Sequence, residues 1–326
     1  MPPRILVTRH VYPEAIAILE AAGDVQYNDT SAGLSADQLQ AAVADKQALV
    51  CQLTDRIDAA VMDAASELKV IANVAVGFDN IDIPVATGRG ILVTNTPGVL
   101  TDTTADLAFA LLMAAGRRIA EADRFLRSGQ WHQWEIDLFS GHDIHGHTLG
   151  ILGLGRIGLG MAKRAQGFGM RVIYHDLERA APEVEDEYGI EYVDRETLFR
   201  DSDFLSVHVP LNDRTRHMVG SAEFELMKPT AVLVNTSRGP VVDERALAEA
   251  LESGQVASAG LDVFEDEPTV EPRLLALENV VLVPHIGSAS IKTRTRMCTM
   301  AAKNAAAVLA GQAPPNPVNP ELLDAE

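Results

Sequence analysis

Three segments in the second half of the chain each place an ionisable side chain shortly after a short apolar run. The three side chains are those of Arg238, Glu267 and His285. A guanidinium can anchor a carboxylate, an imidazole can give or take a proton near neutral pH, and a carboxylate can orient that imidazole. Ligands of open α/β proteins bind where the carboxyl ends of parallel strands meet. The joint placement of the three groups therefore predicts a site that binds a carboxylate-bearing molecule and transfers a proton.

A glycine-rich turn in the middle of the chain predicts a second kind of site. The run Gly153–Gly158 has the form G-x-G-x-x-G, follows the strand-like run Thr148–Leu152 and opens a helical pattern. Its first glycine permits a tight turn, its second lets the backbone approach a pyrophosphate, and its third lets the helix pack on the strand. The next strand-like run ends at Asp176, close to the roughly 20 residues expected for the acid that binds ribose hydroxyls. Together these features predict a dinucleotide site.

Asp176 also bears on which dinucleotide is bound. Its negative charge repels a 2′-phosphate, which favours NAD over NADP. Arg179 follows three residues later and can offset part of that repulsion. The sequence alone therefore leaves NADP as the alternative cofactor.

The first hundred residues contain the elements of one sheet. Short β-rich runs alternate with helical patterns there, which predicts a parallel sheet covered by helices. The expected strands are Arg4–Thr8, Gln47–Cys51, Val70–Val74 and Ile91–Thr94. The expected helices are Pro13–Ala22, Ser35–Ala44 and Asp58–Ala65. Ser35 and Gln38 have the spacing of a capping box, which marks the start of the second helix.

A long apolar helix is expected to follow. The pattern of Asp102–Ala122 predicts one helix, apolar nearly all round between Leu107 and Ala115. Such a helix needs two buried surfaces, of which one domain supplies one, and it therefore predicts a homodimer. The next stretch, Gly129–Gly146, contains Trp131 and Trp134, lacks periodicity and is expected to be an ordered loop.

The second half of the chain contains the elements of another sheet. Six strand-like runs with crossovers predict a doubly wound parallel sheet. The runs are Thr148–Leu152, Arg171–His175, Phe204–His208, Ala231–Asn235, Ser258–Asp262 and Val280–Val283. A last helix is expected at about Ile291–Ala310, followed by the extended, proline-rich stretch Gln312–Pro320. The fold class is therefore expected to be α/β, with two Rossmann-like domains.

Composition excludes several classes of protein. The 326 residues carry a net charge of −19, and such a surface repels nucleic acid and anionic membranes. The longest apolar run has nine residues, against the ~20 that span a membrane. Two cysteines, Cys51 and Cys298, make no disulfide framework and are consistent with the cytoplasm. The acidic run Glu183–Glu187 is expected to be a solvated helix face. Three nearby histidines, at positions 142, 145 and 147, lie in or directly after the expected loop, and no metal site is expected there.

The chain resembles the D-isomer-specific 2-hydroxyacid dehydrogenase family, and within it the branch of glyoxylate/hydroxypyruvate reductases and glycerate dehydrogenases. The resemblance is carried by Asn73–Asp82, Asn95–Asp106, the glycine-rich turn, His208–Leu211 and the segments that hold Arg238, Glu267 and His285. It implies a cofactor domain, residues 99–287, inserted into a flavodoxin-like substrate domain, residues 1–98 and 288–326. It also implies an NAD-dependent oxidoreductase that acts on small 2-keto or 2-hydroxy acids.

The resemblance further implies a role for each matched residue. Arg238 would bind the substrate carboxylate, His285 would be the general acid of reduction, and Glu267 would keep His285 protonated. The other residues expected to bind substrate are Leu53, Val76, Gly77 and Ser288, with Arg294 near the mouth of the site. The residues expected to bind cofactor are Thr104, Gly153, Gly155, Arg156, Ile157, Gly158, Asp176, His208, Pro210, Thr215, Thr236, Asp262, His285 and Gly287.

Two other functions stay open at this stage. Transcriptional corepressors that sense NAD(H) share this fold, although the full set of Arg238, Glu267 and His285 favours an enzyme. A dehydrogenase for phosphohydroxypyruvate would need a cationic phosphate pocket, for which the sequence offers Arg56 with Asp55 beside it. The loop after Trp134 lacks the proline usual in the family, which leaves its path and a contact with a partner's site undetermined.

Overall fold

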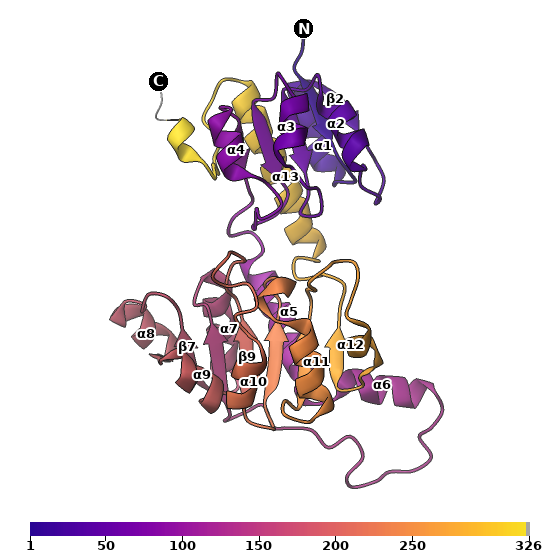
Figure 1. Ribbon diagram of the computed structural model, residues 1–326, viewed down its shortest axis with the longest axis vertical. Helices are drawn as coiled ribbons and strands as arrows, with labels where there is room; N and C mark the ends of the chain where they lie inside the picture. The colour runs from indigo at the N-terminus through magenta and orange to yellow at the C-terminus, as the bar shows by residue number, and fades with distance from the viewer. Residues whose placement is uncertain (324–326) are drawn as a thin grey trace. The chain divides into compact units, whose positions relative to one another are not determined.

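The structure, a computed structural model, describes residues 1–323 and divides into two units, each built on one parallel sheet (Figure 1). The first unit comprises Met1–Leu100 and the chain from Ser288 onward, and the second comprises Thr101–Gly287. The sequence had placed the first boundary after residue 98 and the second after residue 287.

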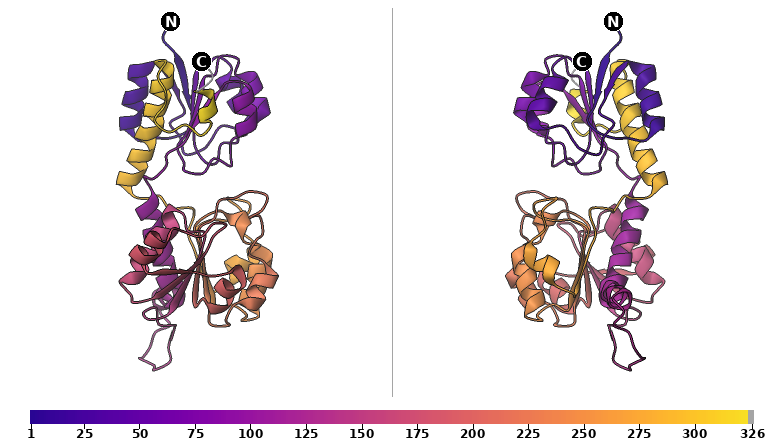
Figure 2. Two further views of the ribbon diagram at one scale, coloured as in Figure 1. Left: turned by 90° about the vertical axis from the view of Figure 1, so that its left-hand side faces the viewer. Right: turned by 90° about the vertical axis from the view of Figure 1, so that its right-hand side faces the viewer.

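The first unit contains a five-stranded sheet in the order β2-β1-β3-β4-β5, the order of flavodoxin-like folds. Its strands are β1 (Arg4–Val7), β2 (Asp24–Tyr27), β3 (Ala48–Cys51), β4 (Val70–Asn73) and β5 (Leu92–Thr94). Its helices are α1 (Pro13–Ala22), α2 (Ala36–Val43), α3 (Ala59–Ala64), α4 (Ile83–Gly88) and α13 (Ile291–Leu309), followed by the short 3₁₀ helix η2 (Pro320–Leu322). Figure 2 shows α1 and α13 on one face of the sheet and α2, α3 and α4 on the other.

Strand β1 shows why both faces of this sheet need a cover. Ile5 and Val7 point into the core that includes Met297 of α13, whereas Leu6 between them joins the core that includes Leu39 of α2. Successive side chains of a strand alternate between faces, so a strand that is apolar throughout requires helices on both sides. The sheet is therefore a rigid support for the loops at its carboxyl edge.

The second unit contains a seven-stranded parallel sheet in the order β12-β11-β10-β9-β6-β7-β8. Its strands are β6 (Thr148–Leu152), β7 (Arg171–His175), β8 (Ile190–Tyr192), β9 (Phe204–Val207), β10 (Val232–Asn235), β11 (Ser258–Leu261) and β12 (Val280–Leu282). The order reverses direction at β6, which is the topological switch point of a doubly wound sheet. The expected fold class is therefore confirmed for both units.

Helices cover both faces of the second sheet as well (Figure 2). They are α5 (Thr101–Gly116), α6 (Ile119–Arg127), α7 (Arg156–Gln166), α8 (Pro182–Tyr188), α9 (Arg195–Asp201), α10 (Ser221–Leu226), the 3₁₀ helix η1 (Gly239–Val241), α11 (Glu244–Glu252) and α12 (Pro272–Ala276). Helices α5 and α7 pack on one face, and α10, α11 and α12 pack on the other.

The prediction of a single helix over Asp102–Ala122 is wrong, because two helices, α5 and α6, occupy this stretch with a break between them. Arg118 adopts the left-handed conformation with φ 52°, which ends one helix and starts the next. The returning chain passes close by: the His142 amide donates to the Gly116 carbonyl at 2.8 Å, and a Cβ on Gly141 would stand 2.4 Å from that oxygen. Helix α5 therefore ends at Gly116, whose carbonyl accepts a hydrogen bond from the returning chain instead of from the next turn of the helix.

The premise of two buried surfaces for Leu107–Ala115 also needs correction. Helix α5 packs on α7 and on strands β10, β11 and β12 of its own unit. Ala108, Leu111 and Leu112 are all at most 3% exposed there. Half of the residues of α5 are buried, and its own unit supplies a packing surface on two sides, a helix and a sheet, so the apolar stretch is not by itself an argument for a partner chain.

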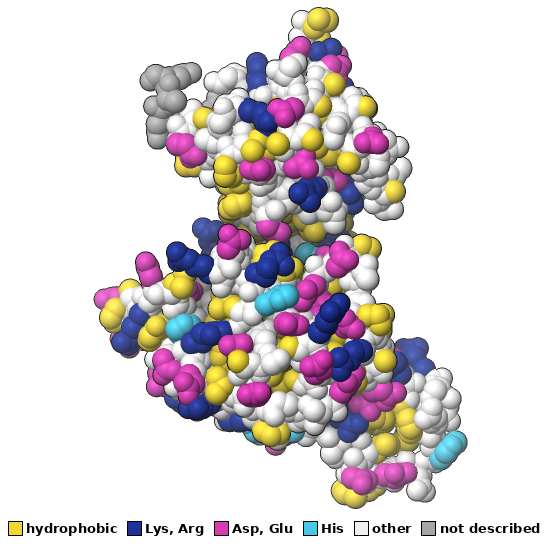
Figure 3. Space-filling model, viewed as in Figure 1, with side chains coloured by type: hydrophobic (Ala, Val, Ile, Leu, Met, Phe, Trp, Pro, Cys, Tyr) yellow, Lys and Arg dark blue, Asp and Glu magenta, His cyan; other side chains and the backbone are white. Residues whose placement is uncertain are grey.

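The surface of the described residues is mixed in charge. On the face shown in Figure 3, basic and acidic side chains alternate, and within that part of the described chain they form no continuous basic stripe. Among residues 1–323, no helix combines the length and apolar character that crossing a membrane requires.

Candidate functional site

Three neighbouring strands of the second unit carry the three ionisable residues expected to do chemistry. Arg238 follows β10, Glu267 follows β11 and His285 follows β12, and these strands are adjacent and parallel. His285 Nδ1 lies 2.8 Å from Glu267 Oε2, and the side chains of both are 25% exposed. The carboxyl edge of the sheet thus brings an imidazole and a carboxylate into contact while leaving both within reach of solvent.

Glu267 is held in its charged form. Burial alone would raise the pKa of its carboxyl group, but the hydrogen bond and charge of His285, the Phe264 amide and the charge of Arg238 together lower that pKa below its usual value. The Phe264 N–H donates to Oε1 at 3.0 Å, so each carboxylate oxygen has a donor. A permanent negative charge therefore stands against the His285 ring.

The backbone of His285 is fixed by Asp262 at the end of β11. His285 has φ 51°, in the left-handed region that few non-glycine residues adopt, and its N–H donates to the Asp262 carbonyl at 2.9 Å. The Asp262 carboxylate accepts the N–H groups of Ile286 at 2.6 Å and Gly287 at 2.8 Å. Asp262 is 1% exposed, and burial raises its pKa against the opposing effect of these amides. Thr104 Oγ1 also donates to the Gly287 carbonyl, at 3.2 Å.

The segment that carries Arg238 packs backbone against backbone on the segment that carries Glu267. A Cβ on Gly239 would stand 1.9 Å from the Phe264 carbonyl carbon, a distance that no side chain tolerates. The Asn235 side chain donates to the Arg238 carbonyl at 3.0 Å and closes the turn after β10. Glycine at position 239 therefore allows the two segments to touch.

Glu244 and Glu265 form a second set of contacts between the chain after β10 and the chain after β11. The sequence analysis did not identify either residue. The Glu244 N–H donates to Glu265 Oε1 at 3.0 Å, and the Glu265 N–H donates to Glu244 Oε1 in return. Glu244 is 6% exposed, and burial raises its pKa despite the amides of Glu265 and Glu271. The signal that was available was the Arg238-Gly239 pair, because a glycine beside a candidate site often marks close backbone contact.

The glycine-rich turn has the room that a phosphate group needs. Gly153 has φ 93°, and a Cβ there would lie 2.9 Å from the His208 carbonyl carbon, so this position requires glycine. Gly158 lies against the Gly153 carbonyl, where a Cβ would stand at 2.4 Å. Gly155, the N-cap of α7, has φ −70° and no atom within 4 Å of its missing Cβ. Neither the backbone angle nor the packing requires glycine at position 155. The close approach of a dinucleotide pyrophosphate to the backbone would require it.

Asp176 at the end of β7 is bound to the glycine-rich turn itself. Its carboxylate accepts the N–H of Leu154 at 2.7 Å and that of Leu177 at 2.7 Å. Arg156 and Ile157 occupy the first turn of α7, whose amino end carries the positive end of the helix dipole. The residues present therefore fit a dinucleotide, with Asp176 also bracing the turn that would hold the phosphates.

Four further residues expected to bind cofactor lie after neighbouring strands. His208 follows β9; burial lowers its pKa to about 4, so the ring is neutral at neutral pH, with Nε2 2.8 Å from Ser206 Oγ. Thr215 Oγ1 donates to the Pro210 carbonyl at 2.6 Å and closes the loop between them. The Thr236 hydroxyl is buried and has no hydrogen-bond partner within residues 1–323.

The expected substrate residues of the first unit lie in loops at the carboxyl edge of its own sheet. Asn95 donates to the Val76 carbonyl at 2.7 Å, and Asn73 donates to the Gly77 carbonyl at 3.0 Å, which fixes the orientation of both peptides. Leu53 follows β3 and is half-buried. At the start of the returning chain, the Arg294 guanidinium lies 3.5 Å from Ser288 Oγ.

The loop around Leu53 does not form a phosphate pocket. The adjoining cavity of about 440 Å³ has Asp58, Asp79 and Asp82 in its lining and a single basic residue, Arg56. Arg56 is exposed and pairs with Asp58 at 3.5 Å. Negative charge dominates this lining, and it disfavours a phosphorylated substrate there.

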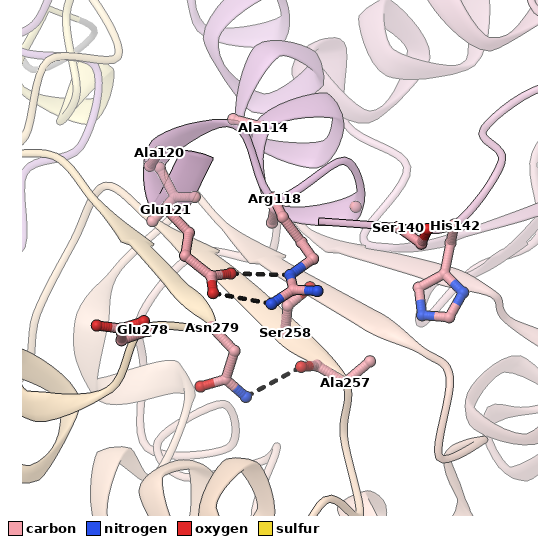
Figure 4. Close-up of a pocket in the computed structure, with 14 residues that line it drawn as sticks. Ala114, Arg118, Ala120, Glu121, Ser140, His142, Ala257, Ser258, Glu278 and Asn279 are labelled. Atoms are coloured by element: carbon pink, nitrogen blue, oxygen red, sulfur yellow. Dashed lines mark hydrogen bonds and ion pairs between the residues drawn. The ribbon is translucent and has the colours of Figure 1, made fainter. Parts of the chain in front are cut away.

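A different cavity of the second unit, of about 80 Å³, lies at the opposite end of the sheet (Figure 4). It is lined by the junction of α5 and α6 and by the amino ends of β11 and β12. Arg118 there is bound at two points by Glu121, at 2.8 Å each. None of the residues expected to do chemistry lines this cavity. Among residues 1–323, no group of three or more His, Cys, Asp or Glu side chains is arranged to hold a metal ion.

Comparisons with known proteins agree with this geometry. Residues 109–287 match the sequence profile described as "D-isomer specific 2-hydroxyacid dehydrogenase, NAD binding domain". The chain is 51% identical to the glyoxylate reductase of Thermococcus litoralis, over 99% of this chain and 98% of that protein. It is 52% identical to the glyoxylate reductase of Korarchaeum cryptofilum, over 99% and 98% of the two chains.

Among solved structures, an NADPH-dependent glyoxylate/hydroxypyruvate reductase of Sinorhizobium meliloti, in complex with NADP and malonate, is similar in fold. It superposes with a TM-score of 0.85 at 34% identity, over 98% of this chain and 97% of that one. These similarities extend over both units and are not confined to the dinucleotide-binding one.

Proposed function

The chain belongs to the D-isomer specific 2-hydroxyacid dehydrogenase family, and we propose that it reduces glyoxylate, hydroxypyruvate or a similarly small 2-keto acid to the D-2-hydroxy acid. It is an oxidoreductase that acts on CH–OH groups. The observation that carries the proposal is the His285–Glu267 hydrogen bond at 2.8 Å, formed where the charge of Arg238 also acts. A keto acid needs one group for its carboxylate and one proton for its ketone oxygen, and this edge of the sheet supplies both.

We assign the proton to His285. Imidazole is the side chain whose proton is most easily exchanged near neutral pH, and the hydrogen bond to Glu267 orients the His285 ring. Reduction requires that this proton pass to the ketone oxygen as the carbonyl carbon becomes tetrahedral. In the reverse direction His285 takes the proton from the hydroxyl, so one residue serves as acid and base.

We assign the substrate carboxylate to Arg238, because a guanidinium offers a planar pair of donors that matches a carboxylate. In the first unit, we propose the amides of Val76 and Gly77 and the apolar side chain of Leu53 as substrate-binding groups. Ser288 and Arg294 are assigned to polar contacts at the mouth of the site. The requirement for Arg238 excludes neutral ketones as good substrates.

We propose NAD(H) as the preferred cofactor, bound by the glycine-rich turn, the amino end of α7 and Asp176. When bound, the reduced nicotinamide supplies the hydride. Thr104, His208, Pro210, Thr215, Thr236, Asp262 and Gly287 are assigned to the rest of the cofactor site. An NADPH-dependent relative exists, and the negative charge of Asp176 is the feature that supports NAD here.

The function is tested by adding NADH or NADPH and a panel of glyoxylate, hydroxypyruvate, pyruvate and phosphohydroxypyruvate to the purified protein. We expect oxidation of NADH with glyoxylate or hydroxypyruvate, and little with the phosphorylated acid because of the acidic lining near Leu53. Tight NADH binding without turnover of any keto acid would instead indicate a cofactor-sensing protein. Faster turnover with NADPH than with NADH would overturn the cofactor assignment.

We also propose a homodimer, formed through α6 and the chain that follows it. None of the residues Ile119–Arg127 is buried, and Ile119 and Leu126 are more than half exposed. The arm between α6 and β6 extends away from its own unit (Figure 1) and exposes Trp131 and Trp134. Exposed aromatic and aliphatic side chains gathered on one helix and arm are typical of an interface between protein chains.

Light scattering at micromolar concentration tests the dimer. We expect twice the mass of one chain for the wild type and a monomer for Leu126→Arg. Leu275→Arg is the matched control, because Leu275 on α12 is 62% exposed, against 56% for Leu126, and lies outside the proposed interface. A monomeric wild type would contradict the proposal.

We place the protein in the cytoplasm. Cys51 and Cys298 are unpaired and buried, and burial raises the pKa of both thiols, which keeps them unreactive. Unpaired thiols are typical of a reducing compartment. Fractionation of the native cells tests this location.

A further inference from the structure

The segment after β7 contains an ion pair that the sequence pattern did not indicate. Glu185 belongs to the acidic run that was expected to be solvated, yet it is 9% exposed. Its carboxylate accepts two hydrogen bonds from Arg179, from Nε at 2.9 Å and from Nη2 at 2.7 Å. The expectation of a solvated face is therefore wrong for Glu185, which turns inward to bind the loop in front of its helix.

Tyr174 of β7 completes this arrangement. Its hydroxyl donates to Glu185 Oε1 at 2.6 Å and accepts the N–H of Ala180 at 2.8 Å. The Arg179 hydrogen bonds and then that of Tyr174 lower the pKa of Glu185 to about 2, so it is charged throughout the physiological range. The loop between Asp176 and α8 is thus tied at Arg179 and at Ala180 to one buried carboxylate and one buried hydroxyl.

Arg179 is held by Glu185 through one edge of its guanidinium. A guanidinium binds a carboxylate or a phosphate through a pair of parallel N–H groups. Glu185 takes the Nε–Nη2 edge, and the guanidinium lies 5.9 Å from the centre of the Tyr192 ring. The Arg179 side chain is 63% exposed, so the ion pair fixes its direction, toward α8, without burying it. Arg179 is the only lysine or arginine from position 176 to 188, so no other cation of this segment can take its place.

We propose that Glu185 determines the choice between NAD(H) and NADP(H), by holding the Arg179 guanidinium and denying it to a 2′-phosphate. Asp176 repels that phosphate directly, and Glu185 draws away the one basic side chain of this segment that would offset the repulsion. The inference rests on the proposed dinucleotide site and adds to it a specificity residue that does not itself touch the cofactor. Tyr174 acts through Glu185 as a positioning residue.

Binding of two adenosine nucleotides by calorimetry tests this without any hydride transfer. The probes are AMP and adenosine 2′,5′-bisphosphate, which differ only in the 2′-phosphate. We expect the wild type to prefer AMP. Glu185→Gln should improve relative binding of the bisphosphate roughly tenfold, the effect of one charge-assisted hydrogen bond gained by Arg179. Glu183→Gln removes the same charge from an exposed position of α8 and should leave the preference unchanged.

Arg179→Ala gives a second test that does not depend on how Glu185→Gln folds. In the wild type Arg179 is withheld, so its removal should leave the preference for AMP unchanged, and in the double variant Arg179→Ala/Glu185→Gln the tenfold gain should disappear. A selective loss of bisphosphate binding in Arg179→Ala would overturn the inference, as would an unchanged preference in a folded Glu185→Gln. Failure of the wild type to bind AMP, the bisphosphate and NADH alike would instead overturn the dinucleotide site, and the inference with it.

Discussion

Replacement of Glu267 by glutamine should slow keto-acid reduction and leave NADH binding nearly unchanged. The His285 ring is the proposed proton donor, and Glu267 Oε2 lies 2.8 Å from its Nδ1. Burial would raise the pKa of Glu267, but the hydrogen bond and charge of His285 lower it below its usual value, so the carboxylate is negative at neutral pH. Glutamine keeps the shape and loses the charge, so a neutral hydrogen bond replaces the charge-assisted one that orients the ring.

The size of the effect follows from the type of hydrogen bond that is lost. A hydrogen bond to a charged group contributes roughly 1.5–3 kcal/mol, against about 0.5–1.5 kcal/mol between neutral partners. Both side chains are 25% exposed, so solvent screens the pair only in part. The midpoints of the two ranges differ by about 1.3 kcal/mol, which corresponds to a roughly tenfold fall in kcat.

The assay is the initial rate of NADH oxidation at saturating NADH and glyoxylate, measured at neutral pH for the wild type and for Glu267→Gln. Asp266→Asn is the control, because Asp266 is the exposed neighbour on the same loop and its loss removes one negative charge without touching His285; its kcat should stay near that of the wild type. NADH affinity should be similar in all three proteins. Equal kcat values for the wild type and Glu267→Gln would refute the role given to this carboxylate.

Three further outcomes are expected. Gly239→Ala should lower the free energy of unfolding in urea by about 3 kcal/mol, since its Cβ would meet the Phe264 carbonyl at 1.9–2.0 Å; wild-type stability would contradict the close packing of the two segments. Arg238→Lys should raise the KM for glyoxylate roughly tenfold or more, since lysine cannot bind a carboxylate through two parallel bonds, and an unchanged KM would remove Arg238 from substrate binding. The pKa of Glu185 in the folded protein is about 2, below its ordinary 4.5, so the Glu185 carboxylate stabilises the fold fully above pH 4.5 and loses this effect as the pH falls towards 2. Glu185→Gln should therefore lose less free energy of unfolding than the wild type between pH 4.5 and pH 2. Equal losses of the two proteins in acid denaturation would contradict the ion pair with Arg179.

Sequence patterns predict the interior strands of both sheets closely and miss one edge strand of each sheet. Strands β6 and β7 have the limits expected, because each is a buried apolar run between turn residues. Strands β2 and β8 were missed. Each is a short edge strand in which polar and half-exposed residues outnumber buried ones, and such a strand is specified by pairing with its neighbour rather than by its own pattern.

In the candidate site, too, some residues could be predicted from the sequence and others could not. The residues on the ends of strands could be expected from spacing, since parallel strands bring His285, Glu267 and Arg238 to one edge. The supports that hold them could not: Glu244 and Glu265 exchange hydrogen bonds across 21 residues, and nothing local in either segment indicates the other. Tertiary contacts of this kind also turned one residue of an acidic run, Glu185, into a buried partner.

The proton donor is the central claim, and the reduction rate of His285→Ala tests it most directly. With saturating NADH and glyoxylate, kcat should fall by roughly 10²–10⁴, the contribution of a general acid, while NADH binding stays near that of the wild type. His217→Ala is the matched control: His217 also has a positive φ, 50°, and lies 3.0 Å from a glutamate, Glu265, and its kcat should stay close to the wild-type value. A kcat near wild type in His285→Ala would contradict the account, because the proton would then come from another group.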